Sequence, residues 1–203
     1  MTNKINIIDS YNKSANERDS QRQQDWKIKE RDIFNKFLID ENKSNLLEIG
    51  AGPGKDSLFF KEQGIDTYST DISPEMVKLC GNKGLIADVM SFDELGFPDN
   101  HFDAVWAMNC LLHVPKDEIS VVLSEIKRVL KPSGLFFMGV YGGKNSEGVW
   151  EDDFYEPKRF FSFYEDDLIK ELLAEFFTIE RFDVVSDEVV GGSFAFQSII
   201  LRN

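Results

Sequence analysis

The sequence predicts an α/β fold, a doubly wound and mostly parallel sheet of seven strands with helices on both faces. From Asn45 onward, short apolar strand patterns alternate with amphipathic helix patterns, which is the order expected of βαβ units. The first strand runs into three glycines at alternate positions, as expected where a strand turns sharply into a helix beside a ligand. Two strand-like runs end the chain, joined by a short turn with Gly191-Gly192, and they predict a terminal antiparallel hairpin.

The N-terminal part is expected to be helical. Residues 1–24 are polar and lack sustained periodicity, whereas apolar residues recur at helical spacing from Trp26 to Asp40. We expect residues 1–44 to cap the site and residues 45–203 to form a Rossmann-like core. The 203 residues, 42% of them apolar, are enough to bury the core of one domain.

The elements of the core follow in order. Ser73 supplies an N-cap and Pro74 the first position of a helix that runs to about Asn82. The clearest helix follows Pro115, with apolar residues from 119 to 130 on one face, and is closed by residues 131–134. The other expected elements are strands at 46–49, 65–70, 85–87, 102–108, 135–141, 178–185 and 193–201, and helices at 55–63 and 166–176.

Polar residues follow several of these strands. Ligands of open α/β sheets collect at the carboxyl ends of the strands, where this chain has the glycines, Asp71, Asp88 and Asn109. A carboxylate at Asp71 can accept hydrogen bonds from both hydroxyls of a ribose. Asp88 lies one strand further out, so it could accept a hydrogen bond from an adenine amino group while Ile72 and Val89 enclose the ring.

Four blocks, in order, resemble the class I methyltransferases that use S-adenosylmethionine. They are residues 48–54 (Glu-Ile-Gly-Ala-Gly-Pro-Gly), 71–76, 97–105 and 130–134. The first block departs from the dinucleotide signature G-x-G-x-x-G, which would need glycine where Lys55 stands. The resemblance covers nearly the whole chain from Leu46 onward. It implies the sheet order 3-2-1-4-5-7-6 with the last strand antiparallel, and S-adenosylmethionine as cofactor.

The resemblance also assigns roles to residues. Gly50 and Gly52 would pass near the amino-acid part of the cofactor, Asp71 would hold the ribose, and Asp88 with Val89 would hold the adenine. Glu48 would orient the loop. The full set expected to bind the cofactor is Glu48, Gly50, Ala51, Gly52, Gly54, Asp71, Ile72, Asp88, Val89 and Asn109.

Methyl transfer from a sulfonium is an in-line displacement, so the protein must align donor and acceptor and supply a base where the acceptor bears a proton. His113 follows the fourth strand, near where the methyl group would point, and is the candidate catalytic residue. A positioning or helix-start role is the alternative. His101, in the turn before that strand, is expected at the surface.

Substrate contacts are expected from outside the cofactor cradle. The connection from Gly142 to Tyr164 is dense in aromatic and charged residues, which is typical of a lid over an apolar or cationic acceptor. The alternative is that the phenylalanines at 160, 161 and 163 anchor it to the core, and we prefer this for those three. The candidates for acceptor contacts are Tyr11, Trp150, Tyr155 and Arg159.

Composition narrows the function. A net charge of −13 weighs against nucleic acid as a partner, because phosphate backbones are bound mainly by lysine and arginine. The chain lacks an Asn/Asp-Pro-Pro-Tyr block after the fourth strand, and it shows no acidic cluster typical of a metal-assisted enzyme, so no metal is expected. A small-molecule O, N or C acceptor is left.

The expected location is the cytoplasm. No apolar run is long enough to span a bilayer or to form a signal peptide, so no membrane partner is expected. Cys80 and Cys110 stand in apolar contexts and are expected as reduced, buried thiols. Two alternatives to a methyltransferase stay open: a nicotinamide-dependent oxidoreductase, disfavoured by Lys55 and the terminal hairpin, and a non-catalytic module that binds S-adenosylmethionine. The acceptor and the oligomeric state stay open as well.

Overall fold

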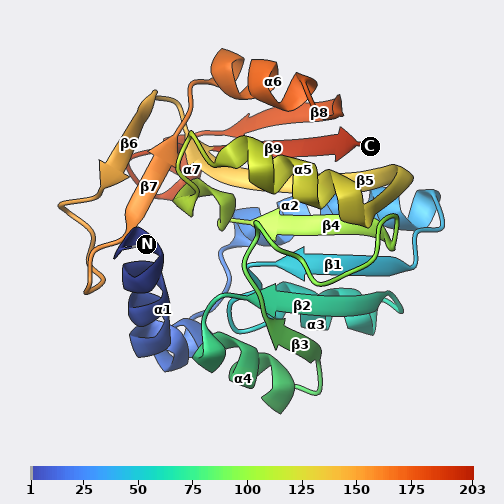
Figure 1. Ribbon diagram of the computed structural model, residues 1–203, viewed down its shortest axis with the longest axis horizontal. Helices are drawn as coiled ribbons and strands as arrows, with labels where there is room; N and C mark the ends of the chain where they lie inside the picture. Colours follow the sequence, from blue (N-terminus) through green and yellow to red (C-terminus); the bar gives the residue numbers. More distant parts are fainter. Residues whose placement is uncertain (1) are drawn as a thin grey trace.

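The structure is a computed structural model that describes residues 2–203; Met1, the first residue of the expected helical cap, lies outside them. A central sheet lies between helical layers, with α5 in front of it and α2 and α3 behind it in the view of Figure 1. The elements in order are α1 (Thr2–Ser20), α2 (Asp25–Asp40), β1 (Asn45–Ile49), α3 (Lys55–Glu62), β2 (Asp66–Asp71), α4 (Pro74–Asn82), β3 (Ile86–Val89), β4 (Phe102–Met108), the 3₁₀ turn η1 (Leu111–His113), α5 (Ile119–Val129), β5 (Leu130–Gly142), β6 (Ser146–Val149), β7 (Phe160–Phe163), α6 (Asp166–Ala174), β8 (Thr178–Val185), α7 (Asp187–Val190) and β9 (Ala195–Arg202).

The main sheet has the order β3-β2-β1-β4-β5-β9-β8, which confirms the predicted order 3-2-1-4-5-7-6. The strand β9 pairs antiparallel with both β5 and β8, and the other pairs are parallel. One detail differs from the expectation. Leu130, the last residue of the predicted helical face, pairs instead with Phe102, and residues 131–134 bulge from the strand with Ser133 at a φ of 60°.

Three segments carry structure that local residue spacing did not define, although the first of them was expected to be helical. Residues 2–20 form one long helix, α1, although few apolar positions mark a face. The connection from 142 to 164 contains a two-stranded antiparallel sheet of β6 and β7. The connection between the terminal strands contains the short helix α7 in addition to the expected turn at Gly191-Gly192. In each case the supporting contacts come from distant parts of the chain, so local spacing carries little signal.

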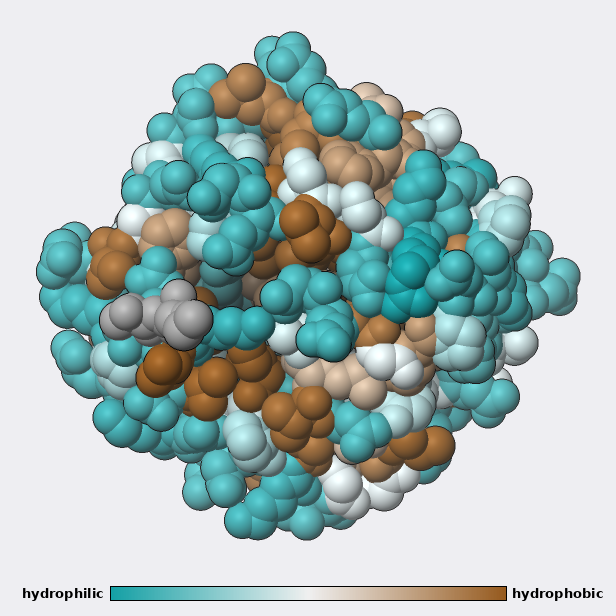
Figure 2. Space-filling view, in the orientation of Figure 1, coloured by the Kyte–Doolittle hydropathy of each residue, from teal (hydrophilic) through white to brown (hydrophobic). Residues whose placement is uncertain are grey.

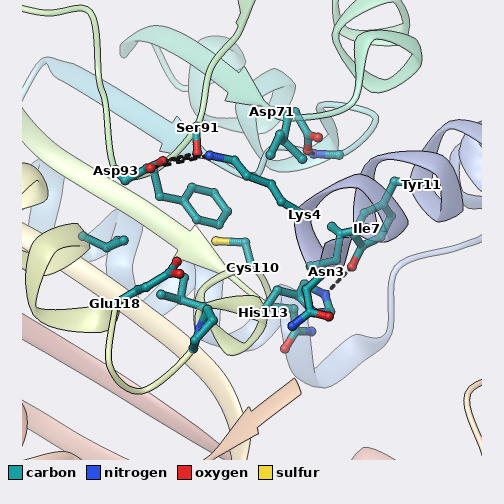
Figure 3. A pocket seen from close by; sticks show the side chains of 18 of the residues that line it. Asn3, Lys4, Ile7, Tyr11, Asp71, Ser91, Asp93, Cys110, His113 and Glu118 are labelled. Carbon is teal, nitrogen blue, oxygen red and sulfur yellow. Dashed lines mark hydrogen bonds and ion pairs between the residues drawn. The ribbon is translucent and has the colours of Figure 1, made fainter. Parts of the chain in front are cut away.

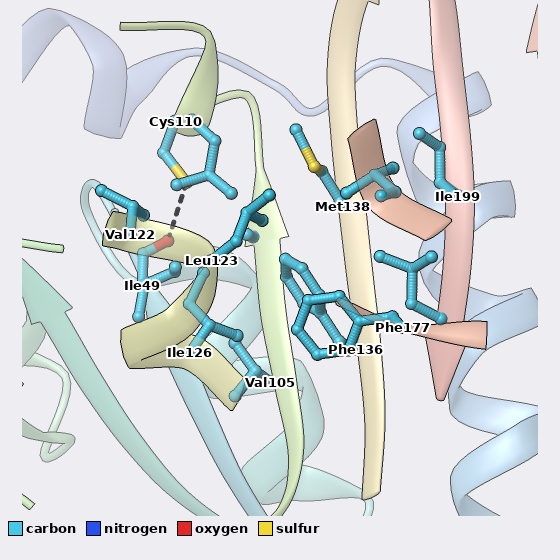
Figure 4. Close-up of a cluster of buried hydrophobic side chains, with 14 of the residues drawn as sticks. Ile49, Val105, Cys110, Val122, Leu123, Ile126, Phe136, Met138, Phe177 and Ile199 are labelled. Carbon is cyan, nitrogen blue, oxygen red and sulfur yellow. Dashed lines mark hydrogen bonds between the residues drawn. The ribbon is translucent and has the colours of Figure 1, made fainter. Parts of the chain in front are cut away.

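Two hydrophobic layers hold the sheet. On one face, Leu123 and Ile126 of α5 pack with Phe136 of β5 (Figure 4). On the other face, Phe34 of α2 packs on Trp106, and the rings of Trp106 and Phe137 stack with centroids 3.9 Å apart. Each fully buried side chain of this size stabilises the fold by about 1.5–3 kcal/mol. The sheet is therefore a rigid base for the loops at its edge.

The carboxyl ends of β1, β2 and β4 lie together at the left of Figure 1, beside α1 and the hairpin of β6 and β7. Hydrophilic side chains cover most of this face of the molecule, and hydrophobic ones gather toward its middle (Figure 2). Within residues 2–203, no helix combines the length and apolar character that crossing a membrane requires.

Candidate functional site

The glycine loop follows β1, and its three glycines have left-handed backbone angles for different reasons. Their φ values are 64° at Gly50, 54° at Gly52 and 79° at Gly54. A Cβ on Gly50 would lie 2.3 Å from the Cβ of Cys110, and one on Gly54 would lie 2.6 Å from a methyl of Leu85. Nothing lies within 4 Å of a Cβ on Gly52. Gly52 is therefore the glycine that faces open space, while the other two permit close packing within the protein.

Asp71 ends β2 and ties it to this loop. Its carboxylate accepts hydrogen bonds from the backbone nitrogen of Gly52 and from that of Ser73, each at 2.8 Å. Burial raises the pKa of the Asp71 carboxyl. Because an ionised carboxylate has about four acceptor sites, lone pairs remain for a ligand. Ile72 follows it at the wall of the same cavity.

Glu48 lies buried beneath the loop. It accepts a hydrogen bond from Ser57 of α3, and Ser57 in turn lies 2.7 Å from the hydroxyl of Ser69 on β2. Burial first, and then the neighbouring Asp56, raise the pKa of Glu48 well above its usual range. Ala51 is held by a 2.9 Å bond from its nitrogen to the carbonyl of Thr70. These contacts fix the loop between α3 and β2.

A cavity opens between the glycine loop and α1 (Figure 3). Gly52, Asp71 and Asn109 line one side of it, and Tyr11 and His113 line the other. At its rim, Lys4 Nζ of α1 pairs with an oxygen of Asp93 at 3.2 Å. The structure therefore brings the predicted cofactor residues next to the predicted catalytic and acceptor residues.

A chain of hydrogen bonds joins Tyr11 and His113 to the hairpin of β6 and β7. His113 Nδ1 lies 2.7 Å from the carbonyl oxygen of Phe160, and because a carbonyl only accepts, Nδ1 carries the hydrogen. Nε2 is then an acceptor, so the Tyr11 hydroxyl, 2.6 Å away, donates to it. Arg159 donates to the Tyr11 oxygen at 3.0 Å and pairs with both oxygens of Asp153 at 2.8 Å.

Burial keeps His113 neutral. Burial lowers the pKa of His113 to about 3, and the nearby Arg159 and Arg18 add to the effect, while the bond to Phe160 opposes it. Burial also raises the pKa of Tyr11. The imidazole is therefore a fixed hydrogen-bond acceptor for Tyr11 across the neutral pH range.

Several expected residues lie elsewhere. Asp88 and Val89 are exposed, and neither lines the cavity; Asp88 accepts a hydrogen bond from Tyr68 instead. The reason is that β3 continues to Val89, two residues beyond the predicted strand, and the chain reaches the cavity only at residues 91–93. Phe92 lines the cavity where Asp88 and Val89 were expected.

The acceptor candidates of the long connection do not line the cavity either. Trp150 packs edge-on against Phe194, with centroids 4.8 Å apart, in an aromatic cluster of the hairpin. Tyr155 is buried and accepts a 3.2 Å hydrogen bond from Arg18. Arg159 reaches the cavity only through Tyr11. The expectation of direct acceptor contacts from these three side chains is thus not supported by the structure.

Arg18, which was not among the expected site residues, lines the cavity from α1. Tyr11 and Arg18 are seven residues apart, so a helix over this segment would have placed them on one face. The expectations for His101 and for the two cysteines are confirmed. His101 is exposed, and Cys80 and Cys110 are free and buried. Within residues 2–203, no three His, Cys, Asp or Glu side chains cluster as metal ligands would.

Comparison with known proteins finds relatives among the methyltransferases. Residues 47–138 match a family model described as a methyltransferase domain. The chain is 27% identical over 130 residues to the phosphoethanolamine N-methyltransferase of Plasmodium falciparum, covering 61% of this chain and 48% of that protein. It is 43% identical over 123 residues to the sterol 24-C-methyltransferase ERG6B of Gibberella zeae, covering 56% and 31%. The chain spans less than half the length of both relatives.

Among solved structures, a Burkholderia thailandensis 1,6-didemethyltoxoflavin N1-methyltransferase, with 1,6-didemethyltoxoflavin and S-adenosylhomocysteine bound, has a TM-score of 0.76. The two chains are 20% identical, and the superposition covers 97% of this chain and 87% of the other. This likeness shows a common fold. With the matched domain over residues 47–138 and the observed strand order, it shows that the chain is similar to the class I, Rossmann-like methyltransferases that use S-adenosylmethionine.

Proposed function

We propose that this chain transfers the methyl group of S-adenosylmethionine to a small-molecule acceptor. One observation carries the proposal: the Tyr11 and His113 pair faces the same cavity as the glycine loop and Asp71. A hydrogen-bonding pair beside the cofactor cradle is what an acceptor with an O–H or N–H group requires. The names of the two relatives support the acceptor class, because phosphoethanolamine and sterols are small molecules.

The residues of the cavity fit the cofactor. The open side of Gly52 admits a ligand next to the backbone, and the free lone pairs of Asp71 suit ribose hydroxyls. Ile72 and Phe92 offer apolar walls for the adenine, in place of Asp88 and Val89. When bound, the cofactor supplies a methyl group made electrophilic by the sulfonium.

Tyr11 is assigned the contact with the acceptor. Its hydrogen points to His113 Nε2 and one lone pair is taken by Arg159, so the second lone pair is left for an O–H or N–H of the acceptor. That contact turns the lone pair of the attacked atom toward the methyl group. His113 does not touch the acceptor directly in this assignment. It positions Tyr11, because an imidazole with a pKa of about 3 resists protonation.

Two measurements test the function. Calorimetry should show binding of S-adenosylhomocysteine and none of NAD, and a labelled methyl donor with a metabolite pool should yield a labelled product. Binding of NAD alone would favour an oxidoreductase. Tight binding of S-adenosylhomocysteine without turnover of any acceptor would favour a non-catalytic module.

The variant Tyr11→Phe tests the assigned role. It should keep its affinity for S-adenosylhomocysteine and lose about 10²-fold in kcat, the scale expected when an acceptor loses the contact that orients it. Tyr68→Phe is the matched control, because this hydroxyl is bound to Asp88 outside the cavity and its loss should leave kcat unchanged.

A further inference from the structure

A second cavity lies on the other side of the glycine loop, between the loop and the turn that joins α1 to α2. Lys27 and Glu48 line it, and it shares Arg18, Gly52 and Asn109 with the first cavity. The two cavities are therefore neighbouring parts of one site that meet at the glycine loop.

Two cations in the second cavity have no anionic partner. Within residues 2–203, no carboxylate oxygen lies within 4 Å of Lys27 Nζ or of the guanidinium of Arg18. Asp56, the acidic neighbour on α3, already pairs with Arg31 at 3.2 Å. The Nε of Arg18 is also buried without a hydrogen-bond partner. Burial, together with Arg18 and Lys55, lowers the pKa of Lys27 to about 8.

Hydrogen-bond acceptors line the same cavity as these two cations. Glu48 has a hydrogen bond only from Ser57, and the side-chain oxygen of Asn109 is buried without any partner. The cavity thus offers cations for a carboxylate and acceptors for an ammonium group. An α-amino acid head carries both charges, and buried charges are tolerated only where they are paired.

We propose that Lys27, with Arg18 beside it, binds the α-carboxylate of the amino-acid part of the cofactor. This inference rests on the proposed function. Lys27 is the more specific of the two cations because it lines only the second cavity, whereas Arg18 also lines the first and donates to Tyr155. The ammonium group of the same amino-acid part faces Asn109 and Glu48.

The test compares two ligands that share the adenosine part. S-Adenosylhomocysteine carries the amino-acid part, and 5′-methylthioadenosine lacks it. Lys27→Gln should weaken S-adenosylhomocysteine about ten- to hundredfold, the scale of one charged hydrogen bond, and leave 5′-methylthioadenosine within twofold. Lys27→Arg should restore part of the loss. Lys29→Gln, at an exposed lysine on the same helix, is the matched control and should change neither affinity.

The outcomes separate the inference from the function. Unchanged affinity of Lys27→Gln for S-adenosylhomocysteine overturns the inference, and so does an equal loss for both ligands, which would show a structural role. If Arg18→Gln weakens S-adenosylhomocysteine and Lys27→Gln does not, the role of Lys27 is refuted, and Arg18 alone would bind the carboxylate. If the unaltered protein binds neither ligand, the proposed function itself is refuted, and this inference with it.

Discussion

Stability should depend on pH through His113. The pKa of this buried imidazole is about 3 in the folded protein, against 6.5 for an ordinary histidine. Below pH 6.5 the unfolded chain binds a proton that the folded protein does not, so stability is lost as the pH falls toward 3. At about 1.4 kcal/mol per pKa unit, the loss is about 2 kcal/mol by pH 5 and approaches ~5 kcal/mol near pH 3.

Urea denaturation at pH 7 and pH 5 measures how much His113 contributes to the pH dependence of the unfolding free energy. Other groups titrate over the same range, so the useful quantity is the difference in unfolding free energy between the unaltered protein and His113→Gln. That difference should shrink by about 2 kcal/mol from pH 7 to pH 5. His101→Gln, at the exposed histidine, should show no such change. An equal difference at both pH values for His113→Gln would refute the neutral, buried imidazole and the hydrogen-bond directions derived from it.

Three further predictions concern the loop and the hairpin. Gly52→Val should weaken binding of S-adenosylhomocysteine at least tenfold in calorimetry. Gly64, which has equally open space around it and a φ of 86°, is the control, and Gly64→Val should bind normally. Normal binding by both variants would show that Gly52 does not face the ligand. Glu48→Gln should raise the melting temperature more at pH 8 than at pH 5, since ionisation of this buried carboxyl costs stability as the pH rises; the reverse order would contradict the raised pKa. Trp150→Ala should lower the melting temperature by roughly 5 °C and leave affinity for S-adenosylhomocysteine intact, because its ring packs outside the cavity; weakened binding would place the hairpin in the cofactor site.

The parts of the fold that depend on neighbouring residues could be predicted from the sequence. Ser73 caps α4 as expected, its hydroxyl accepting from the nitrogen of Met76, and the strand, glycine loop and α3 follow their predicted order. The N-terminal segment was expected to be helical, but residue spacing did not define α1, because this helix buries only a few apolar side chains, such as Ile7 and Ala15. The pairing of β6 with β7 joins segments about ten residues apart with no tight turn between them, so it left no local pattern.

The candidate site was predictable in its residues more than in their contacts. Tyr11 and His113 were both candidates, but a hydrogen bond across 102 residues cannot be deduced from spacing. Arg159 was expected to meet the acceptor, and its salt bridge to Asp153 and its bond to Tyr11 show a supporting position instead. Whether a charged side chain turns toward a ligand or toward its neighbours depends on three-dimensional packing.

The contact between Lys55 and α1 has a consequence for the order of events. Lys55 directly follows the third glycine, and its ammonium group donates to the carbonyl oxygens of Arg18 and Gln21 at the end of α1. The helix that carries Tyr11 is therefore tethered to the loop, and much of its remaining attachment is polar, as in the pairs of Lys4 with Asp93 and of Lys83 with Asp19. We expect a donor seated against the loop to add contacts to α1 and so to steady Tyr11 before the acceptor enters. We therefore expect compulsory-order kinetics, with the methyl donor entering first and the demethylated donor leaving last.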